Sequence, residues 1–173
     1  SSLEASVHKE NRVIAALNGY RNDHFTPYIY LSEDQGTTWK NISISLPMGA
    51  VNSVTEDPNN PHILYLGTDN GLYASLDLGA SWHAFSENLP AVAVHDVVVQ
   101  ASDKHLLVGT HGRSIFKTDI AALGTLANKM ATGKTPALEL FAVEKQRVSP
   151  RWGMARGFSD PYTPEISMGF FVA

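Results

Sequence analysis

The chain has 173 residues, enough for a domain with a substantial hydrophobic core. Its formal net charge is −4 and it has no block of basic residues, so the charge pattern of a nucleic-acid-binding protein is absent. No apolar run reaches the roughly 20 residues that span a bilayer, and the lack of cysteine excludes disulfides and thiolate metal sites.

The first unit of the chain, at about residues 3–46, is predicted to form four short strands. Between the second and third strands lies the polar segment 18–27, which is longer than a tight turn and is expected to be an inserted loop. The strands themselves are expected at 3–8, 13–17, 28–32 and 39–44.

An octet at residues 32–39, Ser-Glu-Asp-Gln-Gly-Thr-Thr-Trp, separates the third and fourth strands. A polar turn that contains glycine, flanked by aromatic and β-branched residues, predicts a β-hairpin. We expect Asp34 to accept hydrogen bonds from backbone N–H groups two residues on, Gly36 to take a positive φ, and Ser32 to bond locally. Trp39 is expected to bury a large apolar area at the base of the hairpin.

The octet returns 43 residues later, at residues 75–82. The second copy supplies Ser75, Asp77, Gly79 and Trp82 in the same order. A period between 20 and 50 residues indicates a propeller or a solenoid. The recurrence also favours a structural role for the two aspartates over a metal ligand or general base, since a catalytic group is not normally needed twice at equivalent places.

The second and third units continue the pattern, at about residues 47–89 and 90–120. In the third unit Asp119 aligns with Asp77, but no glycine or tryptophan follows, and residues 119–131 instead have helix propensity with Asp119 as the N-cap. The predicted strands are 51–56, 63–67, 71–75 and 82–85 in the second unit, and 94–100, 106–109 and 114–118 in the third.

The rest of the chain is predicted to be a helix and a linker strand at 121–145, followed at 146–173 by an irregular connector and the start of a further β domain. Alternating apolar residues place the linker strand at 137–143. The connector carries a set of arginine and aromatic residues that could form a binding patch, although an extended connector is favoured: Arg147, Arg151, Trp152, Arg156 and Tyr162.

Together the units predict an all-β fold, a fragment of a β-propeller with about three four-stranded antiparallel blades, a short helix and an extended C-terminal tail. A closed propeller typically has about 4–8 blades, so we expect the chain to belong to a larger ring. The remaining blades are then its partners. An open piece exposes apolar blade faces, and we expect the isolated chain to self-associate or to cover such a face with its tail.

The octets resemble Asp-boxes, also called BNR repeats, of sialidases, xyloglucan-active glycosidases and the sortilin (VPS10) propeller. Residues 4–8, 27–30, 88–96 and 108–115 are similar to large bacterial proteins with sortilin-like BNR propellers, often labelled glycosyl hydrolases. This resemblance covers about residues 3–145 and implies that these are the C-terminal blades. It also implies an extracellular or periplasmic location.

Binding by a propeller usually occurs on the face where the loops joining strands two and three meet the loops between blades. Here that face would combine residues 18–27, 69–71 and 111–113. Its candidate ligand-binding residues are Arg21, Asp23, His24, Asp69, His111 and Arg113. Arg113 can bind a carboxylate or phosphate bidentately, or can pair with Asp69 or Asp96 of a neighbouring blade. His111 can do acid–base work.

Two functions stay open. One is a binding or scaffold module for protein, peptide or glycan. The alternative is part of a glycoside hydrolase, sialidase-like or xyloglucanase-like, whose catalytic residues lie mostly outside this chain. Asp23, Asp69 and Asp96 are available carboxylates, but no spacing pairs them. Neither a metal nor a cofactor is expected, because the other histidines lack metal-ligand spacing: His8, His62, His83, His95 and His105.

Overall fold

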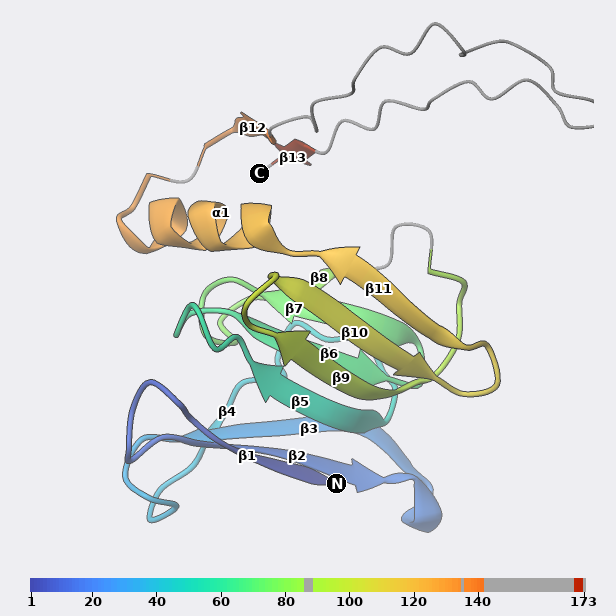
Figure 1. Cartoon of the computed structure of the whole chain (residues 1–173). Helices are drawn as coiled ribbons and strands as arrows, with labels where there is room; N and C mark the ends of the chain where they lie inside the picture. Colours follow the sequence, from blue (N-terminus) through green and yellow to red (C-terminus); the bar gives the residue numbers. More distant parts are fainter. Residues whose placement is uncertain (86–88, 135, 142–169, 173) are drawn as a thin grey trace, which may run out of the picture. The chain divides into compact units, whose positions relative to one another are not determined.

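The computed structural model describes residues 1–85, 89–134, 136–141 and 170–172 (Figure 1). The chain divides into two compact units, Ser1–Lys134 and Thr135–Ala173. The larger unit holds three antiparallel sheets and a helix. In the smaller unit β12 (Leu138–Leu140), which lies inside the predicted linker strand, pairs antiparallel with β13 (Phe170–Val172). The predicted irregular connector falls mostly outside the described residues, together with the arginine and aromatic residues assigned to it.

Sheet A is a four-stranded meander in the order β1-β2-β3-β4. Alternation along the second strand places Ile14 and Ala16 on one face, where both are buried, and Val13 and Ala15 on the other, where both are half-buried. Its strands are β1 (Ser2–Ala5), β2 (Val13–Gly19), β3 (His24–Ser32) and β4 (Lys40–Asn41).

Sheet B repeats this meander, and sheet C repeats its first three strands within the described residues. Sheet B consists of β5 (Val51–Glu56), β6 (Leu64–Thr68), β7 (Gly71–Ser75) and β8 (His83–Ala84). Sheet C consists of β9 (Val94–Gln100), β10 (His105–Thr110) and β11 (Ile115–Asp119). The strand registers put Leu3, Val54 and Val97 at equivalent positions, opposite Ala15, Leu66 and Val108 respectively.

Helix α1 (Ala121–Ala131) follows β11 directly, where sheets A and B continue into an octet turn. The expectation that Asp119 is the N-cap is wrong, because the helix begins one residue later and Ile120 occupies that position. The Asp119 carboxylate still accepts a hydrogen bond from the Ala121 N–H, at 2.7 Å. No helix of the described residues is long and apolar enough to cross a membrane.

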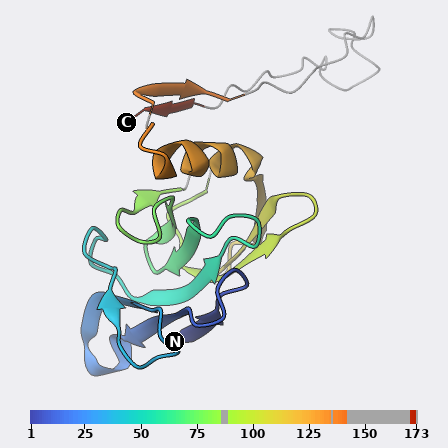
Figure 2. The same cartoon turned by 90° about the vertical axis from the view of Figure 1, so that its left-hand side faces the viewer.

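The three sheets pack face against face, with β5 beside β2 on one side and beside β9 on the other (Figures 1 and 2). Stacked antiparallel sheets with a short helix are the arrangement expected for propeller blades. One apolar core fills the space between sheets A and B, and its buried members are Ile14, Ala16, Ile29, Leu31, Ile42, Val51, Val54, Leu64, Leu66 and Trp82.

The segment predicted as an inserted loop, 18–27, is instead a longer hairpin. Strand β3 begins at His24, which pairs with Gly19, and the 3₁₀ turn η1 (Tyr20–Asn22) closes the hairpin. Gly19 permits this pairing because a Cβ there would lie 2.8 Å from the His24 Cβ. Asp23 turns the chain with a φ of 57°. The hairpin extends the β2–β3 ladder and gives its exposed side chains a rigid base.

The two octet turns share the hydrogen bonds made by their serine hydroxyls. The hydroxyl of Ser32 donates to Asp34 and accepts the Gly36 N–H, both at 2.8 Å, and Ser75 makes the matching bonds at the same lengths. The positive φ expected at the glycines is observed, with 86° at Gly36 and 83° at Gly79.

Each octet carboxylate bonds two residues further along than expected. Asp34 accepts the Thr38 N–H at 2.8 Å and the Thr38 hydroxyl at 2.6 Å, and Asp77 accepts the same pair from Ser81. The expectation that the aspartate accepts the N–H of the residue two positions on is wrong. In the first octet that N–H, of Gly36, donates to the Ser32 hydroxyl instead. These bonds, led by the Thr38 hydroxyl, lower the pKa of Asp34 from its ordinary 3.8 to about 2.

Acid is expected to weaken the fold through these two turns. Burial alone would raise the pKa of Asp77, but the bonds from Ser81 outweigh it, so this pKa is lowered as well as that of Asp34. A lowered pKa stabilises the fold above the ordinary pKa, and this contribution is lost as the pH falls through the folded-state pKa. Urea unfolding between about pH 5 and pH 2 should therefore show a steeper loss of stability for the parent chain than for the D34N/D77N variant. Equal slopes would contradict this account.

The octet tryptophans differ in burial although their positions are equivalent. Trp82 is 7% exposed, and its Nε1–H donates at 2.7 Å to the carbonyl of Ile42, the residue that follows β4 of sheet A. Trp39 is 43% exposed, so the expectation that it buries a large apolar area is wrong. Trp82 owes its burial to the neighbouring sheet, and the described residues place no sheet on the corresponding side of sheet A.

Replacing Gly79 by alanine is expected to destabilise the chain more than replacing Gly36. A Cβ at Gly79 would lie 2.6 Å from Ile42 Cδ1, whereas at Gly36 the nearest atom is Trp39 Cζ2 at 3.4 Å. The strain of a positive φ is common to both variants and cancels in the comparison. Urea unfolding should show an additional loss of about 1–3 kcal/mol for G79A, typical of overpacking. Equal losses of unfolding free energy in the two variants would mean that the Ile42 side chain moves aside without a measurable cost.

Candidate functional site

The turns between second and third strands lie on the same face as the connections between sheets, as predicted. The Asp69 N–H donates to the Ala50 carbonyl at 3.0 Å, and the His111 N–H donates to the Ala93 carbonyl at 2.9 Å. On sheet A the carbonyl of Phe25 accepts the N–H of Gly49. We call this side of the molecule the loop face. The octet turns lie at the other end of the strands.

A row of polar side chains crosses the loop face from sheet A to sheet C. Asn18 donates through Nδ2 to Asn52 Oδ1 at 2.9 Å, and Asn52 donates to Asp69 Oδ1 at 2.9 Å and to the Val94 carbonyl at 3.1 Å. One amide therefore ties together strands of sheets B and C and receives a bond from sheet A.

The row continues in sheet C as a pair of histidines. The rings of His95 and His111 have centroids 5.2 Å apart and planes tilted by 34°. In the repeat these positions correspond to Asn52 and Asp69, which are hydrogen-bonded in sheet B. Asn18, Asn52, Asp69, His95 and His111 are referred to as the polar row. Equivalent backbone positions thus carry an amide–carboxylate pair in one sheet and an imidazole pair in the next.

Of the six predicted site residues, Asp69 and His111 belong to the polar row. Arg21, Asp23 and His24 lie exposed on the sheet A hairpin, where the Arg21 guanidinium carbon is 6.0 Å from the centre of the Tyr20 ring. Within the described part of the chain, no hydrogen bond or ion pair joins these three side chains to Asp69, His111 or Arg113.

Arg113 lies exposed in the turn after β10. The alternative in which it pairs with Asp69 or Asp96 is not observed among the described residues, where the ion pairs involve only Lys9 and Arg12 as cations. Asp69 is bonded by Asn52 instead, and Asp96 accepts its neighbour's N–H, that of Val97, at 3.0 Å. The guanidinium of Arg113 therefore remains available to a ligand.

Sequence reasoning missed Asn18, Asn52 and His95 as site residues. A signal for two of them is present in the sequence, since Asn52 and His95 are 43 residues apart, in the segments Val-Asn-Ser-Val at 51–54 and Val-His-Asp-Val at 94–97. Positions that keep polar side chains on the first strand of a unit while the residue type changes can be found by aligning repeats. The described residues contain no group of three or more His, Asp or Glu side chains placed to hold a metal ion.

A groove of about 390 Å³ between the two octet turns is a weaker candidate. Its polar groups are largely committed to the turns, since the Asp77 carboxylate already accepts bonds from Ser75 and Ser81. The groove is lined by Leu31, Glu33, Thr38, Trp39, Lys40, Asp77, Leu78 and Ala80.

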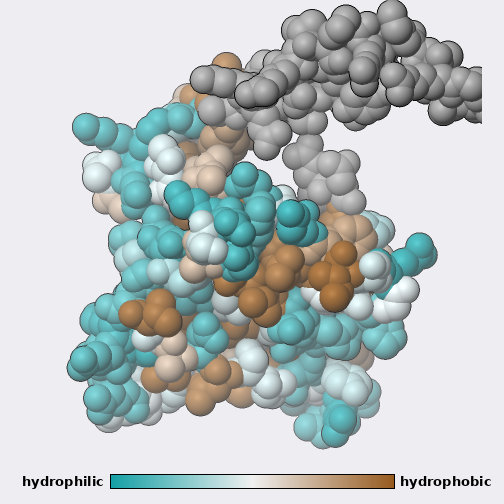
Figure 3. All heavy atoms as spheres, viewed as in Figure 1, coloured by the Kyte–Doolittle hydropathy of each residue, from teal (hydrophilic) through white to brown (hydrophobic). Residues whose placement is uncertain are grey.

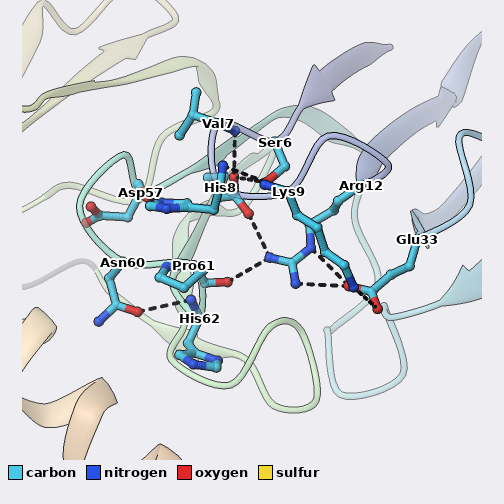
Figure 4. A network of polar contacts seen from close by, with 11 residues as sticks. Ser6, Val7, His8, Lys9, Arg12, Glu33, Asp57, Asn60, Pro61 and His62 are labelled. Carbon is cyan, nitrogen blue, oxygen red and sulfur yellow. Dashed lines mark hydrogen bonds and ion pairs between the residues drawn. The ribbon is translucent and has the colours of Figure 1, made fainter.

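The densest charged cluster lies near the octet turns and joins sheets A and B (Figure 4). Arg12 donates to Glu33 at 2.9 Å, to the buried Glu56 at 3.0 Å and to the Pro61 carbonyl at 3.0 Å. Glu56 also accepts bonds from the Ser6 hydroxyl and the Val7 N–H. Because its buried groups bond one another, this cluster is suited to holding sheets together rather than to binding a ligand.

Solved structures similar to this chain include propeller enzymes. A GH74 xyloglucanase from Xanthomonas campestris matches 70% of the chain with 15% identity and a TM-score of 0.55. The GH74 enzyme of Niastella koreensis matches 68% with 22% identity and a TM-score of 0.55, and an ancestral GH74 enzyme matches 62% with 22% identity and a TM-score of 0.50. No protein-family profile matches the sequence, and no curated protein matches it.

The chain spans 21%, 20% and 16% of the lengths of the Xanthomonas, Niastella and ancestral structures respectively. At these identities the similarity establishes the fold. Stacked antiparallel sheets, their repeated registers and these neighbours agree on one conclusion: the chain is built from blades of the β-propeller type.

Proposed function

We propose that the chain supplies three blades of a larger β-propeller and that its loop face binds a glycan. The polar row carries this proposal. Asp69 commits one carboxylate oxygen to Asn52, and both histidines of the row are exposed, so carboxylate and imidazole groups remain for a ligand. Sugar hydroxyls donate and accept hydrogen bonds and therefore match such mixed groups.

The hairpin of sheet A adds apolar surface at the same face. Tyr20 and Phe25 are each 51% exposed on the β2–β3 hairpin, next to Arg21 and His24. Aromatic rings beside a few convergent polar groups are typical of ligand sites, and a sugar ring can pack on such a ring. The similar solved structures include a xyloglucanase, which favours a glycan over a peptide as the ligand. We also propose an extracellular or periplasmic location for the protein, because the resemblance to BNR-repeat proteins implies one.

NMR titration of the full chain with a xyloglucan oligosaccharide tests the proposal. Amide and imidazole signals of Asn52, Asp69, His95 and His111 should shift. The N52A/D69A variant should bind at least about tenfold more weakly, as expected when hydrogen-bonding groups are removed from a site. D103N, in the β9–β10 turn on the octet side, is the matched control. Shifts confined to the octet turns, or none at millimolar sugar, would refute loop-face binding.

A glycoside hydrolase is the second candidate, favoured by the enzymes among the similar structures. Inverting glycosidases use two facing carboxylates about 6.5–9.5 Å apart, and a carboxylate of another blade could complete such a pair with Asp69 or Asp23. Reducing-sugar release by the complete propeller, abolished in D69N or D23N with binding retained, would support this reading. Unchanged release in both variants would exclude these two residues from catalysis.

A further inference from the structure

Two residues of the polar row occupy a bulge at the start of the first strand of their sheets. In the register of sheet B no residue of β6 pairs with Asn52, and in sheet C no residue of β10 pairs with His95. A bulge leaves its extra residue unpaired and changes the direction of that residue's side chain relative to a regular strand. Asn52 and His95 therefore reach the loop face from equivalent bulges.

The residue that follows the second strand is also held in the same way in both sheets. The Asp69 N–H donates to the Ala50 carbonyl at 3.0 Å, and the His111 N–H donates to the Ala93 carbonyl at 2.9 Å. In sheet B this backbone arrangement brings Asn52 Nδ2 to 2.9 Å from Asp69 Oδ1. The equivalent arrangement in sheet C holds two imidazole side chains next to each other.

The two imidazoles of sheet C are spaced like ligands of one metal ion. The ring centres of His95 and His111 are 5.2 Å apart. Two histidines that bind one tetrahedral zinc ion, through Zn–N bonds of about 2.0–2.1 Å, have ring centres roughly 5 Å apart. Each neutral imidazole has one nitrogen that can accept a bond, and among the described residues no hydrogen bond engages either ring. Both nitrogens can therefore bind an ion.

Both rings are exposed at the loop face, so an ion in solution can reach them. The turn after β10 lies at the right-hand edge of Figure 1, and Figure 3, viewed from the same side, shows hydrophilic side chains at that edge. Within the described part of the chain, no third His, Asp or Glu is placed to complete a metal-binding group. The other coordination positions of an ion bound here would be open to water.

From this we infer that His95 and His111 form a binding site for a divalent transition metal ion, Zn²⁺, Cu²⁺ or Ni²⁺. Imidazole nitrogen suits these ions, whereas Mg²⁺ and Ca²⁺ require oxygen ligands. The site does not depend on glycan binding, because neither Asn52 nor Asp69 is needed for it. The spacing along the sequence does not indicate it, since the two histidines come from different strands.

Titration of the full chain with Zn²⁺, followed by NMR, tests the inference. The imidazole signals of His95 and His111 should shift together and saturate at one ion per chain, and Mg²⁺ should not shift them. Replacing either histidine leaves a single nitrogen ligand, so H95A and H111A should each bind Zn²⁺ at least about tenfold more weakly.

Two further variants serve as controls. His62 is exposed in the β5–β6 turn, and H62A should bind Zn²⁺ like the parent chain. The N52A/D69A variant, which is expected to lose the glycan, should keep its Zn²⁺. A failure of the metal site can therefore be distinguished from a failure of the proposed glycan site.

Three results would overturn the inference. One is the absence of shifts at His95 and His111 in millimolar Zn²⁺. Another is equal Zn²⁺ affinity for the parent chain, H95A and H111A, since the ion would then lie elsewhere. The third is one ion per two chains, with a dimer detected by light scattering. In that case the ion would be held between two copies of the chain and not by the two histidines of one copy.

Discussion

Trp82→Ala is expected to lower the free energy of unfolding by about 3–5 kcal/mol, the range for deleting a large buried aromatic side chain. The indole fills the space between sheets A and B with only 7% of its surface exposed. Its removal also leaves the Ile42 carbonyl without the bond that it now receives at 2.7 Å. Both losses fall on the same interface, so urea unfolding monitored by circular dichroism should show a large drop in midpoint.

Trp39→Ala is the internal control for this prediction. It removes the same side chain from an equivalent octet, but this indole is 43% exposed and has no neighbouring sheet among the described residues. The expected loss is about 1 kcal/mol or less, as for substitutions away from a packed core. Similar losses for the two variants would show that burial against the adjacent sheet is not what makes Trp82 important. Trp82→Phe should fall between them, because it keeps most of the apolar area but not the N–H.

Much of the fold can be predicted from local sequence because each blade repeats the same turn residues and the same alternation of apolar and polar residues along its strands. The octet turns could be predicted since their serine, aspartate and glycine bond within five residues of one another. Strand positions followed from alternation and turn residues, and β9 matches its predicted range of 94–100. The family-level detail of a sortilin-like propeller stays a hypothesis.

The predictions from sequence fail where the structure of a residue depends on contacts with residues that are distant in the sequence. The sequence predicts a buried Trp39 because the two octets are alike, whereas the burial of a tryptophan depends on whether another sheet lies beside it. The sequence predicts a loop at 18–27 because the pairing that makes this segment a hairpin depends on one contact, Gly19 with His24, outside the usual strand pattern. At the loop face, the link from Asn18 to Asn52 joins two sheets, and no spacing within one repeat indicates it.

Arg12→Met is expected to cost about 3–5 kcal/mol, the range for removing one partner of a buried ion pair. The side chain of Glu56 is 1% exposed, and its charge is balanced by Arg12 at 3.0 Å. Without the guanidinium, Glu56 keeps only the bonds from Ser6 and Val7 and stays buried with an uncompensated charge. Lys9→Met is the control, because Lys9 and Glu33 are each 44% exposed and such surface pairs contribute about 0–1 kcal/mol.

A double variant separates the two physical reasons for that loss. If the cost of Arg12→Met comes from the stranded carboxylate, then Arg12→Met combined with Glu56→Met should recover most of it, because a well-packed apolar pair can replace a buried ion pair. If it comes instead from lost bonds to Glu33 and the Pro61 carbonyl, the second substitution should add a further loss. Because Arg12 binds Glu33 next to sheet A and Glu56 in sheet B, recovery in the double variant would show that this ion pair adds little net stability beyond a well-packed apolar contact between the two sheets. A loss for Arg12→Met no larger than that for Lys9→Met would rule out both explanations.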